Sequence, residues 1–381
     1  MIRTRKGTPA NVRKAGAALA AASAAEPRRT TIRDVAARAG VDPSLVSRVL
    51  NDHPKASAGA ETRQRIVEAA RELGYHPNIA ARSLRTARTW TLGLLLPNLT
   101  NPMYAAIAGA VERRAQERGY GLVFGTHVEG ENEAAFTRMM QQARVEGLLT
   151  ASGVLSDAFL KRIALGGLDP VVMLNRRIAG VRASVTVDDA AGAALAARHL
   201  ASLGHKQVAG IFGPGSIDTA ARRRAGFVKA SEEAGIRATL IDGPGLDPVA
   251  GSAAADRIFR DHPSVTSIFA STFAIATGVL RTARLAGVRI PDDISLVALH
   301  DSELADYLNP PLTTIRMPVE EMASRAVDLL LDLIGGAPPR VVVVRTAPAL
   351  IARDSTAPPR NVKPTPATAN SDAEDLDRRR R

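Results

Sequence analysis

The chain has 381 residues, a formal net charge of +12 and no cysteine. The missing cysteines exclude disulfides and thiolate metal sites, and no apolar run approaches the roughly 18 residues that a membrane-spanning helix needs. Seven basic residues accompany one acidic residue in 1–29 and ten accompany six in 30–89, whereas residues 90–354 are neutral overall. The excess positive charge therefore lies where it could neutralise phosphates, although a basic end is also typical of solubilising disorder.

The segment TIRDVAARAGVDPSLVSRVLN, which starts at Thr31, predicts two short helices joined by a tight turn. Thr31 is a good N-cap, and Asp34 closes a capping box three residues later. Gly40 supplies the turn, and Asp42 caps the second helix with Pro43 at its first helical position. Apolar residues recur at helical spacing in both segments, so each helix has one face that can pack inward.

The second helix turns small polar residues and an arginine away from its apolar face. The outward positions are Ser44, Leu45, Ser47, Arg48 and Asn51. Arginine pairs bidentately with guanine, and serine or asparagine reaches phosphates or base edges. The pattern indicates a helix that enters the DNA major groove, although alone it also fits a capped hairpin that merely packs.

A third helix is predicted in 63–74, where apolar residues again recur at helical spacing until Gly74 ends the pattern. From Trp90 onward the chain alternates between strands and helices, and this alternation restarts near residue 184. The predicted strands are 91–96, 121–125, 147–150, 170–175, 184–187, 207–212, 267–270 and 295–299. The predicted helices are 102–118, 131–143, 190–203, 219–234, 251–261, 274–286 and 319–333. This alternation predicts an α/β protein. An N-terminal all-α helix-turn-helix domain precedes two similar lobes with parallel sheets, and a ligand cleft lies between the lobes.

Several motifs in this order resemble the lactose-repressor (LacI/GalR) family of bacterial transcription regulators over residues 31–356. They are DVAARAGV, VSRVLN, LGYHPN and AARSL, then Pro97-Asn98, Asn101-Pro102, Val187-Asp188-Asp189, His199-Leu200 with Leu203-Gly204-His205, and the run from Asn309 to Thr314. The resemblance implies a repressor that binds an inverted-repeat operator as a homodimer and a two-lobed effector domain like that of periplasmic binding proteins. It also implies a hinge helix over 78–84, whose Leu84 would wedge into the minor groove at a flexible base step.

The DNA contacts expected on these grounds involve the reading helix and the hinge. They are Thr31, Pro43, Ser44, Leu45, Ser47, Arg48, Asn51, Asn78, Ala81 and Leu84. Two details prevent the operator of another family member from being assigned to this chain. The first residues of the reading helix do not reveal which bases they contact, and the loop KASAGAE appears two residues longer than is usual in the family.

The resemblance also sets the expected domain boundaries. They are a basic disordered extension (1–29), the helix-turn-helix domain (30–76), the hinge (77–89), the effector and dimerisation domain (90–354) and a disordered tail (355–381). Lobe 1 is expected at about 90–178 and 316–346, and lobe 2 at about 182–313 and 347–354. The chain would then cross between the lobes near 176–184, 313–316 and 346–348.

The ligand-contacting positions depart from the family pattern. Counted without gaps from Gly213-Pro214, the family's arginine position holds Ala221, its Asn-Asp pair is Thr272-Phe273, and His300 replaces an aspartate. A plain neutral sugar is therefore a poor expectation, since unpaired hydroxyl groups are costly to bury. Two hypotheses remain open: a more apolar or anionic effector that His300, Arg176 and Arg177 could meet, or a degenerate site in a regulator controlled by a protein partner or acting constitutively.

Three further residues are candidates for the lining of the cleft, namely Asn101, Tyr104 and His127. A one-residue slip in the count would return an arginine of the Arg222-Arg223-Arg224 run to the cleft.

Nothing in the sequence indicates catalysis, a cofactor or a metal site. The loop from Gly210 to Gly215 follows a predicted strand but is neither a dinucleotide fingerprint nor a Walker sequence, and the histidines are scattered. The segment after Arg13-Lys14 lacks the bulky apolar centre of a signal peptide. We therefore expect a cytoplasmic, nucleoid-associated protein without a membrane partner, rather than an exported binding protein or an enzyme.

Overall fold

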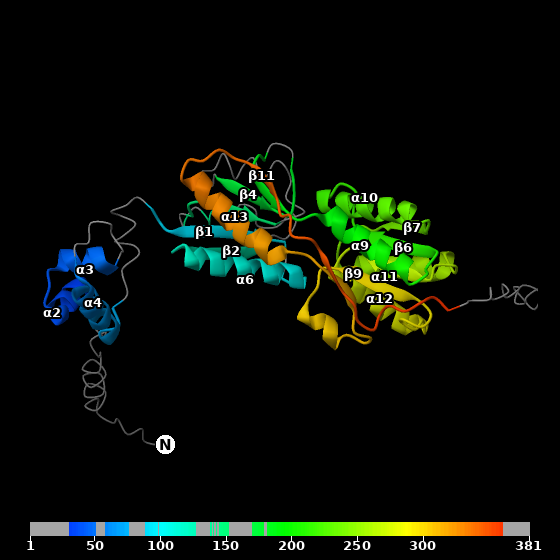
Figure 1. Cartoon of the computed structure of the whole chain (residues 1–381), viewed down its shortest axis with the longest axis horizontal. Coiled ribbons are helices and arrows are strands. Elements are labelled where there is room, and N and C mark those ends of the chain that lie inside the picture. Colours follow the sequence, from blue (N-terminus) through cyan, green and yellow to red (C-terminus); the bar gives the residue numbers. More distant parts are fainter. Residues whose placement is uncertain are drawn as a thin grey trace, which may run out of the picture. The chain divides into compact units, whose positions relative to one another are not determined.

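The structure is a computed structural model that describes residues 30–50, 58–75, 88–97, 99–126, 138, 140, 142, 145–151, 170–178 and 181–360. The chain divides into two compact units, residues 1–88 and 89–381 (Figure 1).

The described part of the first unit contains three helices around a small apolar core. They are α2 (Ile32–Ala39), α3 (Pro43–Leu50) and α4 (Ala60–Glu72). Val35, Val46 and Ile66, one from each helix, are fully or almost fully buried in this core. The spacing of apolar residues thus predicted the packing of the hairpin and of the third helix.

Local hydrogen bonds fix the ends of α2 as the sequence predicted. The Asp34 carboxylate accepts from Thr31 N and from the Thr31 hydroxyl, each at 2.7 Å. Gly40 ends the helix with φ 63°, a conformation that side chains disfavour. The turn between α2 and α3 is therefore set by local chemistry.

The described part of the second unit contains two six-stranded sheets. In the first sheet, the order β11-β5-β4-β3-β1-β2 is parallel throughout. In the second, the order is β12-β10-β9-β8-β6-β7, with only β12 antiparallel to its neighbour. The strands are β1 (Thr91–Leu96), β2 (Gly121–Thr126), β3 (Leu148–Thr150), β4 (Val171–Leu174), β5 (Ser184–Thr186), β6 (Gln207–Phe212), β7 (Arg237–Asp242), β8 (Ser267–Ala270), β9 (Ser295–Leu299), β10 (Thr313–Arg316), β11 (Val341–Val343) and β12 (Ala349–Ile351).

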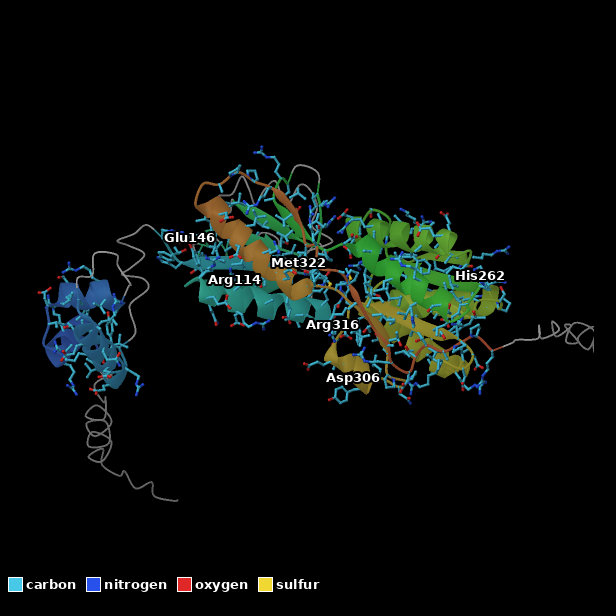
Figure 2. The ribbon with its side chains drawn as sticks, viewed as in Figure 1. Arg114, Glu146, His262, Asp306, Arg316 and Met322 are labelled. Atoms are coloured by element: carbon cyan, nitrogen blue, oxygen red, sulfur yellow. The ribbon has the colours of Figure 1, made fainter. Side chains whose placement is uncertain are left out.

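Helices pack on both sheets and complete two lobes. In lobe 1, α6 (Pro102–Glu117) lies beside α13 (Val319–Ile334), and Arg114 of α6 bonds to Asp328 of α13 with Nη2–Oδ2 at 2.8 Å (Figure 2). Lobe 2 carries α9 (Asp189–Ser202), α10 (Asp218–Glu233), α11 (Pro248–Asp261), α12 (Phe273–Ala286) and the 3₁₀ helix η1 (Glu303–Tyr307). Alternating strands and helices thus form the two-lobed α/β domain predicted above.

Backbone contacts set how closely the helices of lobe 2 can approach. A Cβ added to Gly226 of α10 would lie 2.2 Å from the carbonyl oxygen of Ala190 in α9. Glycine is therefore required for this helix pair to pack as observed.

The lobe boundaries differ from those expected. β5 pairs with β4 and β11 and so belongs to lobe 1, which moves the first crossing from 176–184 to about residues 187–188. The whole of β10 belongs to lobe 2, which moves the second crossing to residues 317–318. The alternation of elements could not reveal this, because it does not specify which sheet a short strand joins.

The expectation of disorder from Ser355 onward is wrong for residues 355–360. Ser355 is fully buried, its hydroxyl donates to Leu296 O at 2.6 Å, and it accepts from Thr313 N at 2.8 Å. The backbone carbonyl of Ala357 also contacts His205 Nε2 at 3.0 Å. Hydrogen bonds of this kind produce no apolar pattern in the sequence, so the pattern could not predict that these residues are ordered. Residues 361–381 and 1–29 lie outside the described residues.

Among the described residues, the structure contains no helix that combines the length and apolar character needed to cross a membrane.

Candidate functional site

The exposed edge of α3 is formed by Ser44 and Arg48. Ser44 N donates to the Asp42 carboxylate at 2.7 Å, and this interaction with Ser44 lowers the pKa of Asp42. Arg48 Nε donates to Ser44 O, and Arg48 Nη2 to Ser44 Oγ, both at 3.2 Å. The guanidinium thus lies along the first turns of the helix, next to the Ser44 hydroxyl group.

The remaining predicted residues of this helix are less exposed. Pro43 and Ser47 are half-buried, and Leu45, expected to point outward, packs partly against the core of the first unit. Thr31 is exposed at the start of α2. Asn51, Asn78, Ala81, Leu84 and the cleft candidate His127 lie outside the described residues.

A cavity of about 560 Å³ lies between the two lobes of the second unit. Its wall includes residues that follow the carboxyl ends of strands: Pro97 after β1, Ala151 after β3, Asn175 after β4, Pro214 after β6 and Pro244 after β7. Ligands of parallel α/β folds bind at this edge of the sheets. The cavity is therefore where the topology predicts a ligand.

Four of the predicted cleft residues line this cavity, namely Asn101, Tyr104, Arg176 and Thr272. Asn101 caps α6 by accepting from Met103 N at 3.1 Å, and Thr272 caps α12 by accepting from Ile275 N at 3.1 Å. Burial raises the pKa of Tyr104, an effect that the charges of Arg223 and Arg176 oppose.

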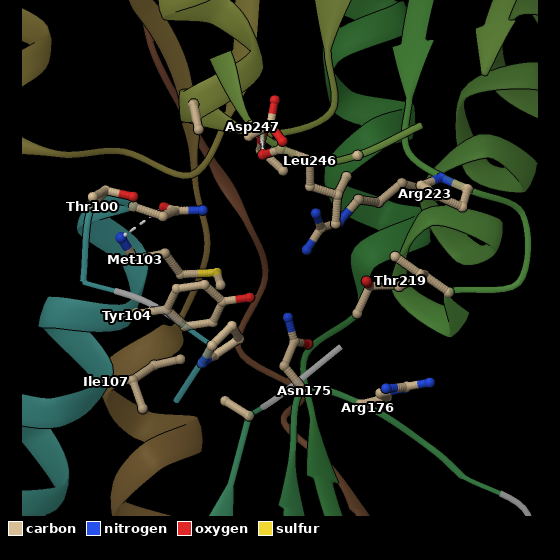
Figure 3. A pocket seen from close by; sticks show the side chains of 18 of the residues that line it. Thr100, Met103, Tyr104, Ile107, Asn175, Arg176, Thr219, Arg223, Leu246 and Asp247 are labelled. Atoms are coloured by element: carbon tan, nitrogen blue, oxygen red, sulfur yellow. Dashed lines mark hydrogen bonds between the residues drawn. The ribbon is translucent and has the colours of Figure 1, made fainter. Parts of the chain in front are cut away.

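Ala221, Phe273 and His300 do not line the cavity. Ala221 is exposed on α10, Phe273 packs in the core of lobe 2, and His300 is buried behind Arg223. The arginine of α10 that faces the cavity is Arg223, two positions beyond the gap-free count (Figure 3). Two residues rotate a side chain by about 200° around a helix, so a small counting error exchanges the exposed face for the buried one.

Arg223 is held by a buried polar network. Its Nε donates to Asp189 Oδ1 at 2.7 Å, its Nη1 donates to Ser271 O at 3.0 Å, and its Nη2 lies 3.0 Å from His300 Nε2. A guanidinium has only donors, so His300 accepts through Nε2. Burial, and secondarily the charge of Arg223, hold the pKa of His300 well below its ordinary value, which keeps this imidazole neutral.

The neighbouring Arg222 connects the lobes beside the cavity. Its Nη2 donates to Asn175 O of lobe 1 at 3.1 Å, and its Nη1 donates to Val187 O of the first crossing at 3.0 Å. It also forms ion pairs with Asp189 at 2.7 Å and Asp218 at 3.1 Å, and Asp218 accepts from Arg177 N of lobe 1 at 3.0 Å. Sequence reasoning missed this contact, because the arginine run gave no sign of which member faces which group.

Among the described residues, no group of three or more His, Cys, Asp or Glu side chains is arranged to hold a metal ion. Two other histidines have protein partners: the buried His205 contacts Thr266 and Ala357, and the half-buried His199 contacts Thr356.

Two family models match the chain. Residues 31–78 match bacterial regulatory proteins of the lacI family, and residues 197–356 match a periplasmic binding protein-like domain. The first region contains the helix-turn-helix, and the second contains most of lobe 2 together with α13 and β11 of lobe 1.

Curated relatives and solved structures cover most of the chain. It is 34% identical to the transcriptional regulator DegA of Bacillus subtilis over 78% of this chain and 89% of that protein, and 34% identical to the transcriptional repressor PurR of Erwinia tasmaniensis over 86% and 97%. The lac repressor dimer bound to operator and the anti-inducer ONPF superposes with a TM-score of 0.68 at 26% identity, covering 87% of this chain and 100% of that one. The CelR-cellobiose complex superposes with a TM-score of 0.65 at 29% identity, covering 86% and 100%. The chain therefore belongs to the LacI family and is a DNA-binding transcriptional repressor rather than an enzyme.

Proposed function

We propose that the protein binds an inverted-repeat operator as a homodimer and that a small molecule in the inter-lobe cavity modulates this binding. The observation that carries the DNA side is the exposed Ser44–Arg48 edge on a helix fixed by its own caps and core. Two such helices related by a twofold axis read a palindrome. The dimer on operator seen in the lac repressor relative supports this arrangement.

The hinge contacts expected of Asn78, Ala81 and Leu84 belong to the same proposal. An apolar wedge at Leu84 would kink the operator at a flexible step and so add specificity. A regulator of this kind works in the compartment that holds the chromosome, so we place it in the cytoplasm, at the nucleoid.

The inter-lobe cavity supports the regulatory half of the proposal. Its wall combines apolar side chains with the charged Arg223 and Arg176, as a specific ligand site requires. The relative CelR is described as a cellobiose complex, which gives this fold a precedent for a small ligand. The buried support of Arg223 favours a working site over the degenerate one, because a buried guanidinium without a role would be costly to keep.

Binding-site selection tests this function. Purified full-length protein is incubated with fragmented DNA from its own source, and bound fragments are sequenced at two salt concentrations. We expect an enriched inverted repeat that survives the higher salt. Diffuse binding that disappears as salt rises would show only phosphate attraction and would contradict the proposal.

A further inference from the structure

The wall of the inter-lobe cavity is rich in hydrogen-bond donors. The guanidinium group of Arg223 and the hydroxyls of Tyr104 and Thr219 point into it, and Arg176 also lines it (Figure 3). Among the described residues that line the cavity, the one carboxylate is that of Asp247, an exposed residue whose Oδ1 already accepts from Ala250 N at 2.8 Å. Hydroxyl groups can also accept, but among the described lining residues a ligand with many hydroxyl groups would find only this one carboxylate to accept its protons.

Arg223 has donors to spare. A guanidinium carries five N–H bonds, and three of those in Arg223 are directed to Asp189, Ser271 O and His300. Each Nη atom therefore keeps one N–H that no described residue accepts. The side chain points into the cavity, where these two donors can meet one planar anion.

The positive charge of Arg223 is only partly neutralised. Asp189 is the carboxylate within ion-pair distance among the described residues, and Arg222 shares it through Oδ2 at 2.7 Å. On the other side stands His300, a neutral acceptor at a position where the family resemblance implies an aspartate. A ligand anion would complete the charge balance of this buried group.

Two more features constrain the ligand. Apolar side chains cover much of the wall, including Met103, Ile107 and Leu246. Asn175, only 5% exposed, lies in the wall of the cavity, and its amide nitrogen, a further hydrogen-bond donor, points into the cavity (Figure 3). A donor at this position favours an acceptor on the ligand.

We propose that the cavity takes a small organic carboxylate with an apolar body. The carboxylate binds the two remaining N–H groups of Arg223, and the amide N–H of Asn175 is a further donor in the cavity wall. This inference rests on the proposed regulatory function of the cavity and names the chemical class of its ligand.

Pairs of ligands that differ in charge test whether the cavity of the unaltered full-length protein prefers an anion. The probes are 4-hydroxybenzoate, 4-hydroxyphenylacetate, mandelate and 2-hydroxyhexanoate, each compared with its primary amide, alongside ribose, glucose and glucose 6-phosphate. Binding is measured by thermal shift and calorimetry. We expect at least one carboxylate to bind about tenfold or more tightly than its amide, because only the anion gains the charge-assisted bonds.

Two variants locate the effect. Arg223→Gln should abolish the preference for the carboxylate over the amide. Asn175→Asp keeps the shape of the side chain at a positive φ of 53°, which aspartate tolerates. Its negative charge should weaken binding of the carboxylate by about tenfold or more and leave binding of the amide unchanged. The second variant leaves the Arg223 network intact and so protects the test from a folding defect in the first.

The inference would be overturned if a sugar, a sugar phosphate or an amide bound more tightly than every carboxylate. It would also be overturned if the unaltered protein and both variants bound the carboxylates equally, or if no carboxylate of the panel bound at all. Sugar binding with an intact inverted-repeat preference would reject the ligand class and keep the proposed function. Loss of that DNA preference in the same preparation would instead reject the proposed function.

Discussion

Arg48 is the exposed side chain of α3 best suited to discriminate between bases. Arg48→Ala should lower the preference for operator over random DNA by about 1–3 kcal/mol if this guanidinium reads guanine. Fluorescence anisotropy on both duplexes measures the preference. Arg38→Ala is the matched control, since Arg38 is also exposed and forms a surface ion pair with Glu72 that contributes little to stability. An equal loss of affinity for both duplexes would show that Arg48 contacts only phosphate.

His300 makes stability depend on pH in a defined direction. Its folded pKa lies below its unfolded value, so the unfolded chain binds the extra proton first as the pH falls. The stability contribution is therefore complete above the ordinary pKa and is lost below it, by up to about 1.4 kcal/mol per pH unit. Thermal melts between about pH 7.5 and 5.5 should show a smaller decrease for His300→Asn than for the unaltered protein. His199 and His205, whose pKa values burial also lowers, contribute to the remaining slope in the same direction. An unchanged slope in the variant would mean that His300 is not held neutral.

At the scale of elements, Gly226 tests the contact between α9 and α10. A methyl group at Gly226 would meet the backbone of Ala190, which no rotamer change can relieve. Gly226→Ala should therefore destabilise lobe 2 by about 1–3 kcal/mol or more in denaturant unfolding. Gly109→Ala in α6 is the control, because its added Cβ meets only the end of the Arg113 side chain at 3.4 Å. Better helix propensity should make that variant neutral or up to about 1 kcal/mol more stable. The same sign for both substitutions would contradict the packing described here.

Periodicity and capping residues predicted the elements with strong local signals. α2 and α3 were predicted with Thr31, Asp34 and Gly40 in their observed roles, because these contacts lie within a few residues. β7, β10, β11 and β12 were missed: β7, β11 and β12 are edge strands without clear alternation, and β10 spans only four residues. In the cavity, Arg223 was misplaced because its face depends on helix phase, and the buried role of His300 depends on contacts across 77 residues.

At the scale of the whole molecule, Arg222 ties the two lobes of the second unit together next to the ligand cavity. Without its side chain, the hydrogen bonds to Asn175 O and Val187 O are lost, and Asp189 forms its ion pair with Arg223 alone. Arg222→Ala should therefore increase the radius of gyration in X-ray scattering without ligand and weaken ligand binding. Arg224→Ala is the control, since this neighbour is 44% exposed and pairs at 3.5 Å with Asp242 of its own lobe. Equal scattering profiles for the two variants would exclude a role for Arg222 in lobe closure.

The central claim is that two copies of α3 read the two halves of one DNA site. The most direct test titrates the full-length protein onto the selected inverted repeat and onto the same duplex with one half-site scrambled, at one fixed salt concentration. We predict that the scrambled duplex binds at least about a hundredfold more weakly, because half of the base contacts are lost while phosphate attraction remains. Equal affinity for the two duplexes would contradict twofold reading of a palindrome, and with it the proposed mode of repression.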